Sequence, residues 1–178
     1  MRLCGLAVIL TVSLTLAPLA ADAQEAGKVW RIGTLDYGSQ APRAHLWHAF
    51  RQGLRELGLV EGQNILLESR WAGGNAAELP RLAEELVRLK VDLIAVASTP
   101  AALAIKHATS TIPVVFMSVG DVTNVGLAGS LAHPGGNLTG VATLTTEASS
   151  KWIELLREAS PIPSIGIVWD ANNAAAVV

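Results

Sequence analysis

The chain has 178 residues, of which 51% are hydrophobic and 16% are charged, so its composition excludes a disordered chain, a collagen-like repeat and a charged coiled coil. Its 13 Lys and Arg residues face 15 Asp and Glu residues, for a net charge of -2. Without a basic excess to hold a phosphate backbone, the composition argues against a nucleic-acid partner.

The first 23 residues have the layout of a cleavable secretory signal peptide. Arg2 precedes an apolar run over residues 6–16, and the small-residue triplet 21–23 follows. Cleavage after Ala23 would leave Gln24 as the first mature residue. A membrane anchor is the weaker alternative, because the apolar run is shorter than the roughly 20 residues that a spanning helix needs. We therefore expect an exported, periplasmic protein.

The single cysteine, Cys4, lies inside this segment. A lipoprotein would carry its cysteine directly after the cleavage site, where this sequence has Gln24. The mature chain would then contain no cysteine, which excludes disulfides, cysteine nucleophiles and thiolate metal sites. Export without disulfides is compatible with a bacterial periplasm.

From residue 29 onward, short β-branched apolar runs alternate with stretches of helical spacing. This alternation is typical of βαβ units, and near-continuous apolar runs such as LIAVA suit parallel strands covered on both faces. The pattern predicts strands over residues 29–35, 65–71, 92–98, 112–117, 138–142 and 164–169.

Three helices are expected between the strands, each with one apolar face toward the core. Leucines and a phenylalanine three or four apart define the first two faces, and residues 147–159 form the third helix. The expected core residues are Leu46, Phe50, Leu54 and Leu57, then Leu79, Leu82, Leu86 and Leu89, and finally Trp152, Leu155 and Leu156.

Ligands of open parallel sheets bind beyond the carboxyl ends of the strands, where loops and helix N-termini converge. The loops expected there are rich in hydroxyl and amide side chains. They comprise residues 36–40, 98–100, 118–121, 143–146 and 170–173.

Motifs for catalysis and for phosphate binding are missing from these loops. The sequence has no G-x-S-x-G elbow, no P-loop and no G-x-G-x-x-G, and the HPGGN segment at 133–137 precedes a strand, so it is interpreted as a turn. His45 and His48 stand three apart, but without a third ligand they are interpreted as a solvated helix face. No metal site or cofactor is expected.

The remaining residues favour recognition of a small polar ligand. Ser98 and Thr99 before Pro100 predict a helix N-terminus, whose free N–H groups could bind a ligand carboxylate or be capped by these side chains. Tyr37 could stack on a ligand or cover the sheet edge. Asp121 could accept from a ligand amine or cap the segment that follows it.

The order of these segments resembles one family. RIGTLDYGS at 31–39, VEGQN at 60–64, STPAALA at 98–104, VGDV at 119–122 and HPGGNLTGV at 133–141 occur in sequence across the expected mature chain. Together they resemble the ABC transporter substrate-binding protein family, whose characterised relatives include tryptophan and tyrosine binders.

The resemblance implies a type I periplasmic-binding fold, an α/β protein whose parallel sheet is flanked by helices, with ligand held between two lobes by hinge closure. It implies a solute-binding component of an ABC importer that delivers an amino acid or similar small organic molecule to an inner-membrane permease with a cytoplasmic ATPase. It implies no enzyme activity and no catalytic residue. Ligand contacts carried over from the family are Tyr37, Gly38, Ser98, Thr99, Ser118 and Asp121.

The resemblance also implies a domain division with a signal peptide at 1–23, a first lobe at 24–146 and a crossover helix with the start of a truncated second lobe at 147–178. We expect such a fragment to bind weakly by itself, because half the cleft is absent. The alternatives are a small exported flavodoxin-like enzyme that uses Asp36, Asp121 or Asp170, and a sensor domain.

Overall fold

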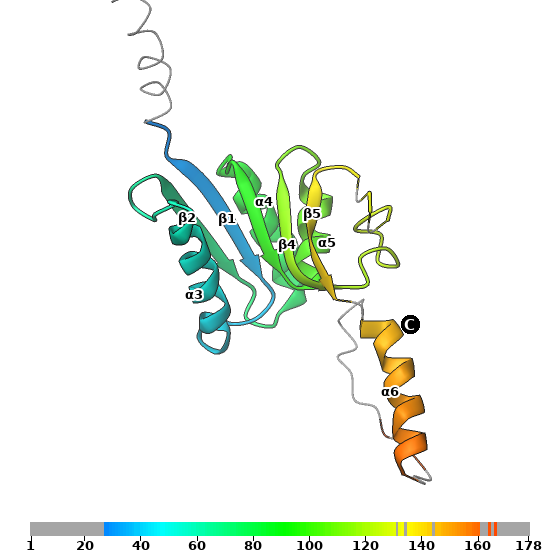
Figure 1. Cartoon of the computed structure of the whole chain (residues 1–178). Helices are drawn as coiled ribbons and strands as arrows, with labels where there is room; N and C mark the ends of the chain where they lie inside the picture. Colours follow the sequence, from blue (N-terminus) through cyan, green and yellow to red (C-terminus); the bar gives the residue numbers. More distant parts are fainter. Residues whose placement is uncertain are drawn as a thin grey trace, which may run out of the picture.

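The structure, a computed structural model, describes residues 27–130, 132–133, 135–143, 145–160, 164 and 166. The expected signal peptide, Asp170 and most of the expected strand at 164–169 lie outside these residues. The described part of the chain forms a five-stranded parallel sheet in the order β2-β1-β3-β4-β5 (Figure 1). The predicted parallel α/β architecture is confirmed.

The observed strands agree closely with the first three predicted from apolar runs, and with the fifth. The fourth strand begins two residues later and ends three residues later than predicted, because a β-bulge between Met117 and Val119 carries it on to Gly120. The strands are β1 (Trp30–Asp36), β2 (Ile65–Trp71), β3 (Leu93–Ala97), β4 (Val114–Gly120) and β5 (Leu138–Thr143).

Helices cover the two faces of the sheet unequally. In Figure 1, α3 lies against one face over β1 and β2, whereas α4 and α5 pack on the other face. Gly58, with φ +79°, follows the end of the first helix, as its position in the sequence predicts. The helices are α3 (Gln40–Glu56), the short 3-10 helix η1 (Ala76–Glu78), α4 (Leu79–Arg88), α5 (Thr99–Ala108) and α6 (Thr145–Ala159).

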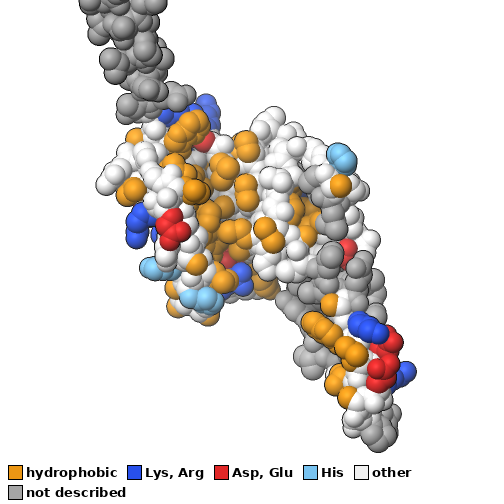
Figure 2. Space-filling model, viewed as in Figure 1, with side chains coloured by type: hydrophobic (Ala, Val, Ile, Leu, Met, Phe, Trp, Pro, Cys, Tyr) orange, Lys and Arg blue, Asp and Glu red, His pale blue; other side chains and the backbone are white. Residues whose placement is uncertain are grey.

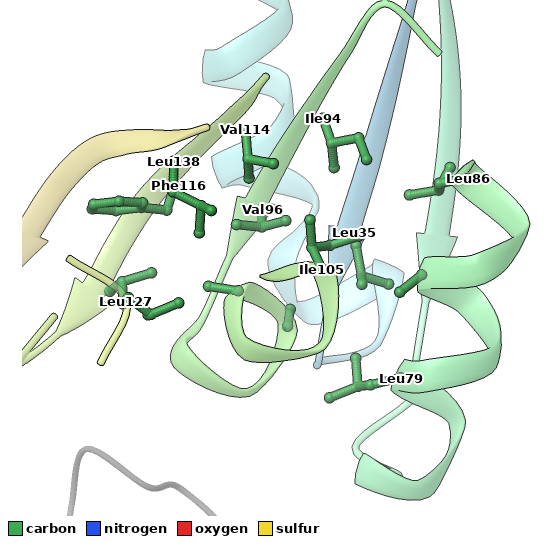
Figure 3. Close-up of a cluster of buried hydrophobic side chains, with 14 of the residues drawn as sticks. Leu35, Leu79, Leu86, Ile94, Val96, Ile105, Val114, Phe116, Leu127 and Leu138 are labelled. Atoms are coloured by element: carbon green, nitrogen blue, oxygen red, sulfur yellow. The ribbon is translucent and has the colours of Figure 1, made fainter. Parts of the chain in front are cut away.

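The main core lies between the sheet and the α4–α5 layer (Figure 3). The predicted stripe of α4 is confirmed, because Leu79, Leu82 and Leu86 are buried and Leu89 packs against the cluster. A side chain at Gly33 would crowd Leu86, since a Cβ there would lie 3.1 Å from its Cδ2 atom. The absence of a side chain on β1 thus lets α4 approach the sheet closely.

The face of α3 that contacts the sheet agrees only in part with the predicted one, since Phe50 packs there and Leu54 is half-buried. Trp47 is 4% exposed and makes edge-to-face contacts with Phe50 and Trp71, whereas Leu46 and Leu57 are 46% and 80% exposed. The prediction that Leu46 and Leu57 lie in the core was therefore wrong. A buried hydrogen bond joins the Trp47 indole to Asp36 at the end of β1, so the contact face of α3 contains Trp47 and Phe50 in place of Leu46 and Leu57.

The third predicted helix exists as α6, but its apolar face does not lie in a core. Trp152, Leu155 and Leu156 were predicted to face inward, yet they are 59%, 49% and 49% exposed. Figures 1 and 2 show α6 beyond the end of the sheet, with apolar side chains along its surface. Helical periodicity identifies an apolar stripe, but it does not identify the surface that covers it.

Candidate functional site

The strand order of the sheet reverses between β1 and β3, and open α/β sheets bind ligands in a crevice at the carboxyl ends of two such strands. We use the word crevice below for this switch point, between the loop that follows β1 and the start of α5. The chain leaves β1 into α3 on one face and leaves β3 into α5 on the other. Asp36 pairs in register with Ala97, so Tyr37 and Ser98 continue from neighbouring strand ends. Such a topological switch point is where open α/β sheets bind ligands.

A buried carboxylate organises the β1 side of this crevice. The Asp36 side chain is 1% exposed and accepts three hydrogen bonds. The Gly38 amide donates to Oδ1 at 2.8 Å, while the Trp47 indole and Arg43 Nε donate to Oδ2 at 2.8 and 2.7 Å. A buried charge needs this degree of pairing. Hydrogen bonds to the Asp36 side chain therefore hold both the loop after β1 and the first turns of α3.

Tyr37 and Gly38 form the loop that this carboxylate holds. The Tyr37 carbonyl accepts from the Gly74 amide at 2.7 Å, and the Gly38 carbonyl accepts from the Gly73 amide at 3.2 Å. Tyr37 is half-buried and packs partly against the main core. Any side chain at Gly38 would clash with the Arg43 side chain, which crosses the loop at that point.

Ser98 marks the β3 side of the crevice with an unusual backbone. Its φ of 118° and ψ of 149° belong to a region that is occupied almost only by glycine. It is the N-cap of α5, as predicted, but its side chain makes no capping hydrogen bond. Its Oγ atom is buried and has no hydrogen-bond partner among the described residues. A buried hydroxyl without a partner is costly in a native protein.

The hydroxyl of Thr99, unlike that of Ser98, has a hydrogen-bond partner within the described residues. Thr99 is 4% exposed, and its Oγ1 accepts from the Gly120 amide at 3.2 Å. This bond ties the start of α5 to the end of β4. Of the two residues predicted to bind a ligand carboxylate, Ser98 is thus the one whose hydroxyl makes no hydrogen bond to the described part of the protein.

The residues at the end of β4 lie at the same edge, one strand further away. Ser118 occupies the bulge, is exposed and has a φ of 54°. Asp121, with φ 45°, accepts from the Asn124 side-chain amide at 2.8 Å, and its own amide donates to the Thr143 carbonyl at 3.4 Å. Residues 122–126 form turns and residue 127 a bend, so the described part of the segment that Asp121 was expected to cap, up to residue 130, contains no helix.

Sequence reasoning missed two contributors to the site, Arg43 and Trp47. Their signal was the spacing from Asp36, since residues 7 and 11 positions later share the first turns of one helix face. Both donate to the same carboxylate oxygen. The resemblance had drawn attention to the loop itself, whereas the groups that hold the loop come from the following helix.

Features away from this crevice add no chemistry to it. A mainly apolar hollow of about 260 Å³ lies at the opposite, amino end of the strands, lined by Trp30, Ile32, Leu59, Ile65, Asp92 and Leu93. His45 and His48 are exposed, as predicted for a solvated helix face. Within the described ranges, no group of three or more His, Cys, Asp or Glu residues could hold a metal ion. None of the helices described there has the length and apolarity required to cross a membrane.

This fold and switch-point crevice define a protein like the periplasmic binding proteins. A structure of a conserved domain protein from Vibrio cholerae is similar, with a TM-score of 0.76 and 30% identity over 84% of this chain. The ABC domain in complex with L-Trp from Streptococcus pneumoniae is also similar, with a TM-score of 0.61 and 28% identity over 65% of this chain. A ligand-free, open substrate-binding protein with adhesive properties from Clostridium difficile gives a TM-score of 0.65 and 28% identity over 75% of this chain.

The chain belongs to the ABC transporter substrate-binding protein family, whose family model matches residues 40–178. It is 32% identical over 125 residues to the tyrosine-binding protein of Clostridioides difficile. That match covers 70% of this chain and 36% of the relative. The chain likewise spans 50%, 39% and 44% of the three solved structures. The resemblance based on five sequence segments is confirmed.

Proposed function

We propose that the chain is part of the solute-binding component of an ABC importer, outside the cytoplasm, and that it takes up a small organic molecule of the amino-acid class. The observation that carries this proposal is the buried, partnerless Ser98 hydroxyl at the start of α5, in the crevice between β1 and β3. Such a component encloses the ligand by hinge closure between two lobes and passes it to a membrane permease coupled to an ATPase.

The α5 terminus offers what a ligand carboxylate needs. The first amides of a helix have no carbonyl partner within the helix, and the helix dipole favours negative charge beside them. The Ser98 hydroxyl adds a donor, and the half-buried Tyr37 follows the end of the neighbouring strand β1. The names of two relatives, an L-Trp complex and a tyrosine-binding protein, support this ligand class.

We propose binding without catalysis. Asp36 was one of three aspartates considered for acid–base chemistry, but all of its hydrogen bonds go to protein donors and its side chain is 1% exposed. A carboxylate stabilised in this way is a poor proton donor or acceptor for a substrate. Since the family members matched are substrate-binding proteins, the enzyme and sensor alternatives have no support from the described residues.

Titration of the isotope-labelled chain with L-tryptophan, L-tyrosine and L-leucine, followed by backbone amide NMR shifts, tests this proposal. We expect shifts at residues 37–38 and 98–101, with Ser98→Ala weakening binding and Ser110→Ala, a substitution at an exposed serine in the loop after α5, leaving it unchanged. Shifts confined to the hollow around Trp30, or no shifts with any of the three, would contradict the proposal.

A further inference from the structure

Arg43 presents an oriented cation at the rim of the crevice without using most of its donors. Its Nε group donates to Asp36, and this is the only hydrogen bond recorded for its side chain among the described residues. The side chain is 33% exposed. We propose that Arg43, beside the end of β1, binds the ligand carboxylate together with the N-terminus of α5, an inference that rests on the function proposed above and names its specificity-determining group.

Asp36 holds the guanidinium in one orientation. The carboxylate is buried and fixed by the Gly38 amide and the Trp47 indole, so the 2.7 Å bond to Arg43 Nε has a rigid acceptor. The stem of Arg43 also crosses Gly38, where a side chain would displace it. Both constraints reduce the rotamer entropy that a long side chain would otherwise lose on binding a ligand.

The unused donors match one chemical class. A guanidinium carries five N–H groups in a planar fork, and with Nε bonded to Asp36 the two Nη groups remain as a pair. That pair fits the two oxygens of a carboxylate in a bidentate arrangement. Lysine would keep the charge but lose the second hydrogen bond and the fixed plane.

Helix stability does not explain a cation at this position. Arg43 is the fourth residue of α3, and the first turn of that helix has no acidic residue. A positive charge near a helix N-terminus opposes the helix dipole. Arg51, two turns further along the same helix, pairs with the exposed Glu61 at 3.2 Å and is a surface ion pair of the ordinary kind.

The test follows the Nε–Hε NMR signal of Arg43 in the wild-type chain during titration with L-tryptophan and with L-tryptophanamide. The amide analogue keeps the ring and the amino group but has no carboxylate. We expect the acid to shift the Arg43 signal and to bind at least about tenfold more tightly than the amide, because one charge-assisted bidentate pair is lost.

Variants then assign the difference to the guanidinium. Arg43→Gln should lower affinity for the acid about tenfold and leave affinity for the amide nearly unchanged, and Arg43→Lys should recover only part of the loss. Arg51→Gln is the matched control and should bind like the wild type. Urea unfolding of each variant checks that the fold persists, and the wild-type signal remains a test if Arg43→Gln does not fold.

The outcomes separate this inference from the proposed function. If amides 98–101 respond to the acid while the Arg43 signal stays still, or if Arg43→Gln binds like Arg51→Gln, Arg43 is not the recognition residue and the binding function stands. If neither region responds to L-tryptophan, L-tyrosine or L-leucine, both proposals are overturned. A response of Arg43 to acid and amide alike also refutes recognition of the carboxylate.

Discussion

At the scale of single residues, the carboxyl edge of the sheet contains local arrangements that do not favour stability. Ser98, Ser118 and Asp121 all have positive φ, at 118°, 54° and 45°, although none is glycine. Each such residue costs on the order of 1–3 kcal/mol. They follow or interrupt two adjacent strands, β3 and β4, at the edge where the crevice lies. A fourth non-glycine residue with positive φ, Lys90, lies before β3 at the other end of the strands, so three of the four gather at the carboxyl edge. Strained residues often cluster at binding sites.

Two substitutions at Ser98 separate the effect of backbone strain on stability from the effect of the hydroxyl on ligand binding. We expect Ser98→Gly to be more stable than Ser98→Ala by about 1 kcal/mol, because only glycine adopts φ 118° and ψ 149° without strain. Both variants lack the hydroxyl, so both should bind the ligand more weakly than the wild type. Urea denaturation gives the stabilities. Equal stability of the two variants would show that the backbone at residue 98 relaxes in solution.

Asp92, at the opposite end of the strands, should make the free energy of unfolding depend on pH in a definite direction. The hydrogen bond from the Arg31 amide, together with Lys28, lowers the pKa of Asp92 below its usual value. Its contribution to stability is therefore complete above the unfolded pKa near 3.9, and it is lost as pH falls through the lower folded pKa.

The free energy of unfolding, measured by urea unfolding at several pH values, should fall less between pH 6 and pH 2 in Asp92→Asn than in the wild type. The wild type and the variant should differ most above about pH 4 and converge in stronger acid. Glu84→Gln, at an exposed ion pair on α4, is the matched control. A constant difference between wild type and Asp92→Asn down to pH 2 would contradict the lowered pKa.

The candidate residues could be named from the sequence to different degrees. Ser98 and Thr99 were found because a proline after two hydroxyl residues indicates a helix start, and the structure places them there. The sequence does not show which of the two hydroxyls bonds to the protein, because Gly120, the partner of Thr99, is 21 residues away in the chain. Arg43 was missed for a similar reason, since its role depends on the burial of Asp36.

At the scale of elements, α3 shows how a polar contact can override an apolar pattern. Phe50 of the predicted stripe does pack against the sheet, but Trp47 is buried in place of Leu46. Trp47 makes edge-to-face contacts with Phe50 and Trp71, and its indole donates a hydrogen bond to Asp36. The stripe of α4 contains no such competing group, and its prediction was correct. Periodicity therefore predicts a helix face well only where one type of interaction decides it.

Substitutions at two neighbouring residues of α3 test which of them contributes to the buried face of the helix. Trp47→Ala should destabilise the fold by about 3–5 kcal/mol, because it removes a buried aromatic side chain and leaves Asp36 without one donor. Leu46→Ala, at a position 46% exposed, should change stability by only about 0.5 kcal/mol. Urea unfolding of both variants compares them directly. A larger effect at Leu46 would favour the leucine face that the sequence predicted.

At the scale of the whole molecule, packing differs sharply along the chain. β1, β3 and β4 are flanked by strands on both sides, and the main core covers one of their faces. In contrast, no described residue of α6 belongs to either of the two buried hydrophobic clusters. Its Trp152, Leu155 and Leu156 side chains are about half exposed or more. Local apolar pattern predicted both regions equally well as elements, but only one of them has a partner within the described residues.

This contrast predicts the order in which backbone amides exchange with solvent. A helix of 15 residues without tertiary packing is marginal in water, so amides of α6 should exchange through local opening at low free energy. Amides of β3 should exchange only through global unfolding, and those of α4 nearly as slowly. Hydrogen–deuterium exchange read by mass spectrometry at several protein concentrations measures both regions in one sample. Protection of α6 equal to that of β3 would contradict the expectation and show that its apolar face is covered in solution. Protection that rises with concentration would identify a second copy of the chain as the cover.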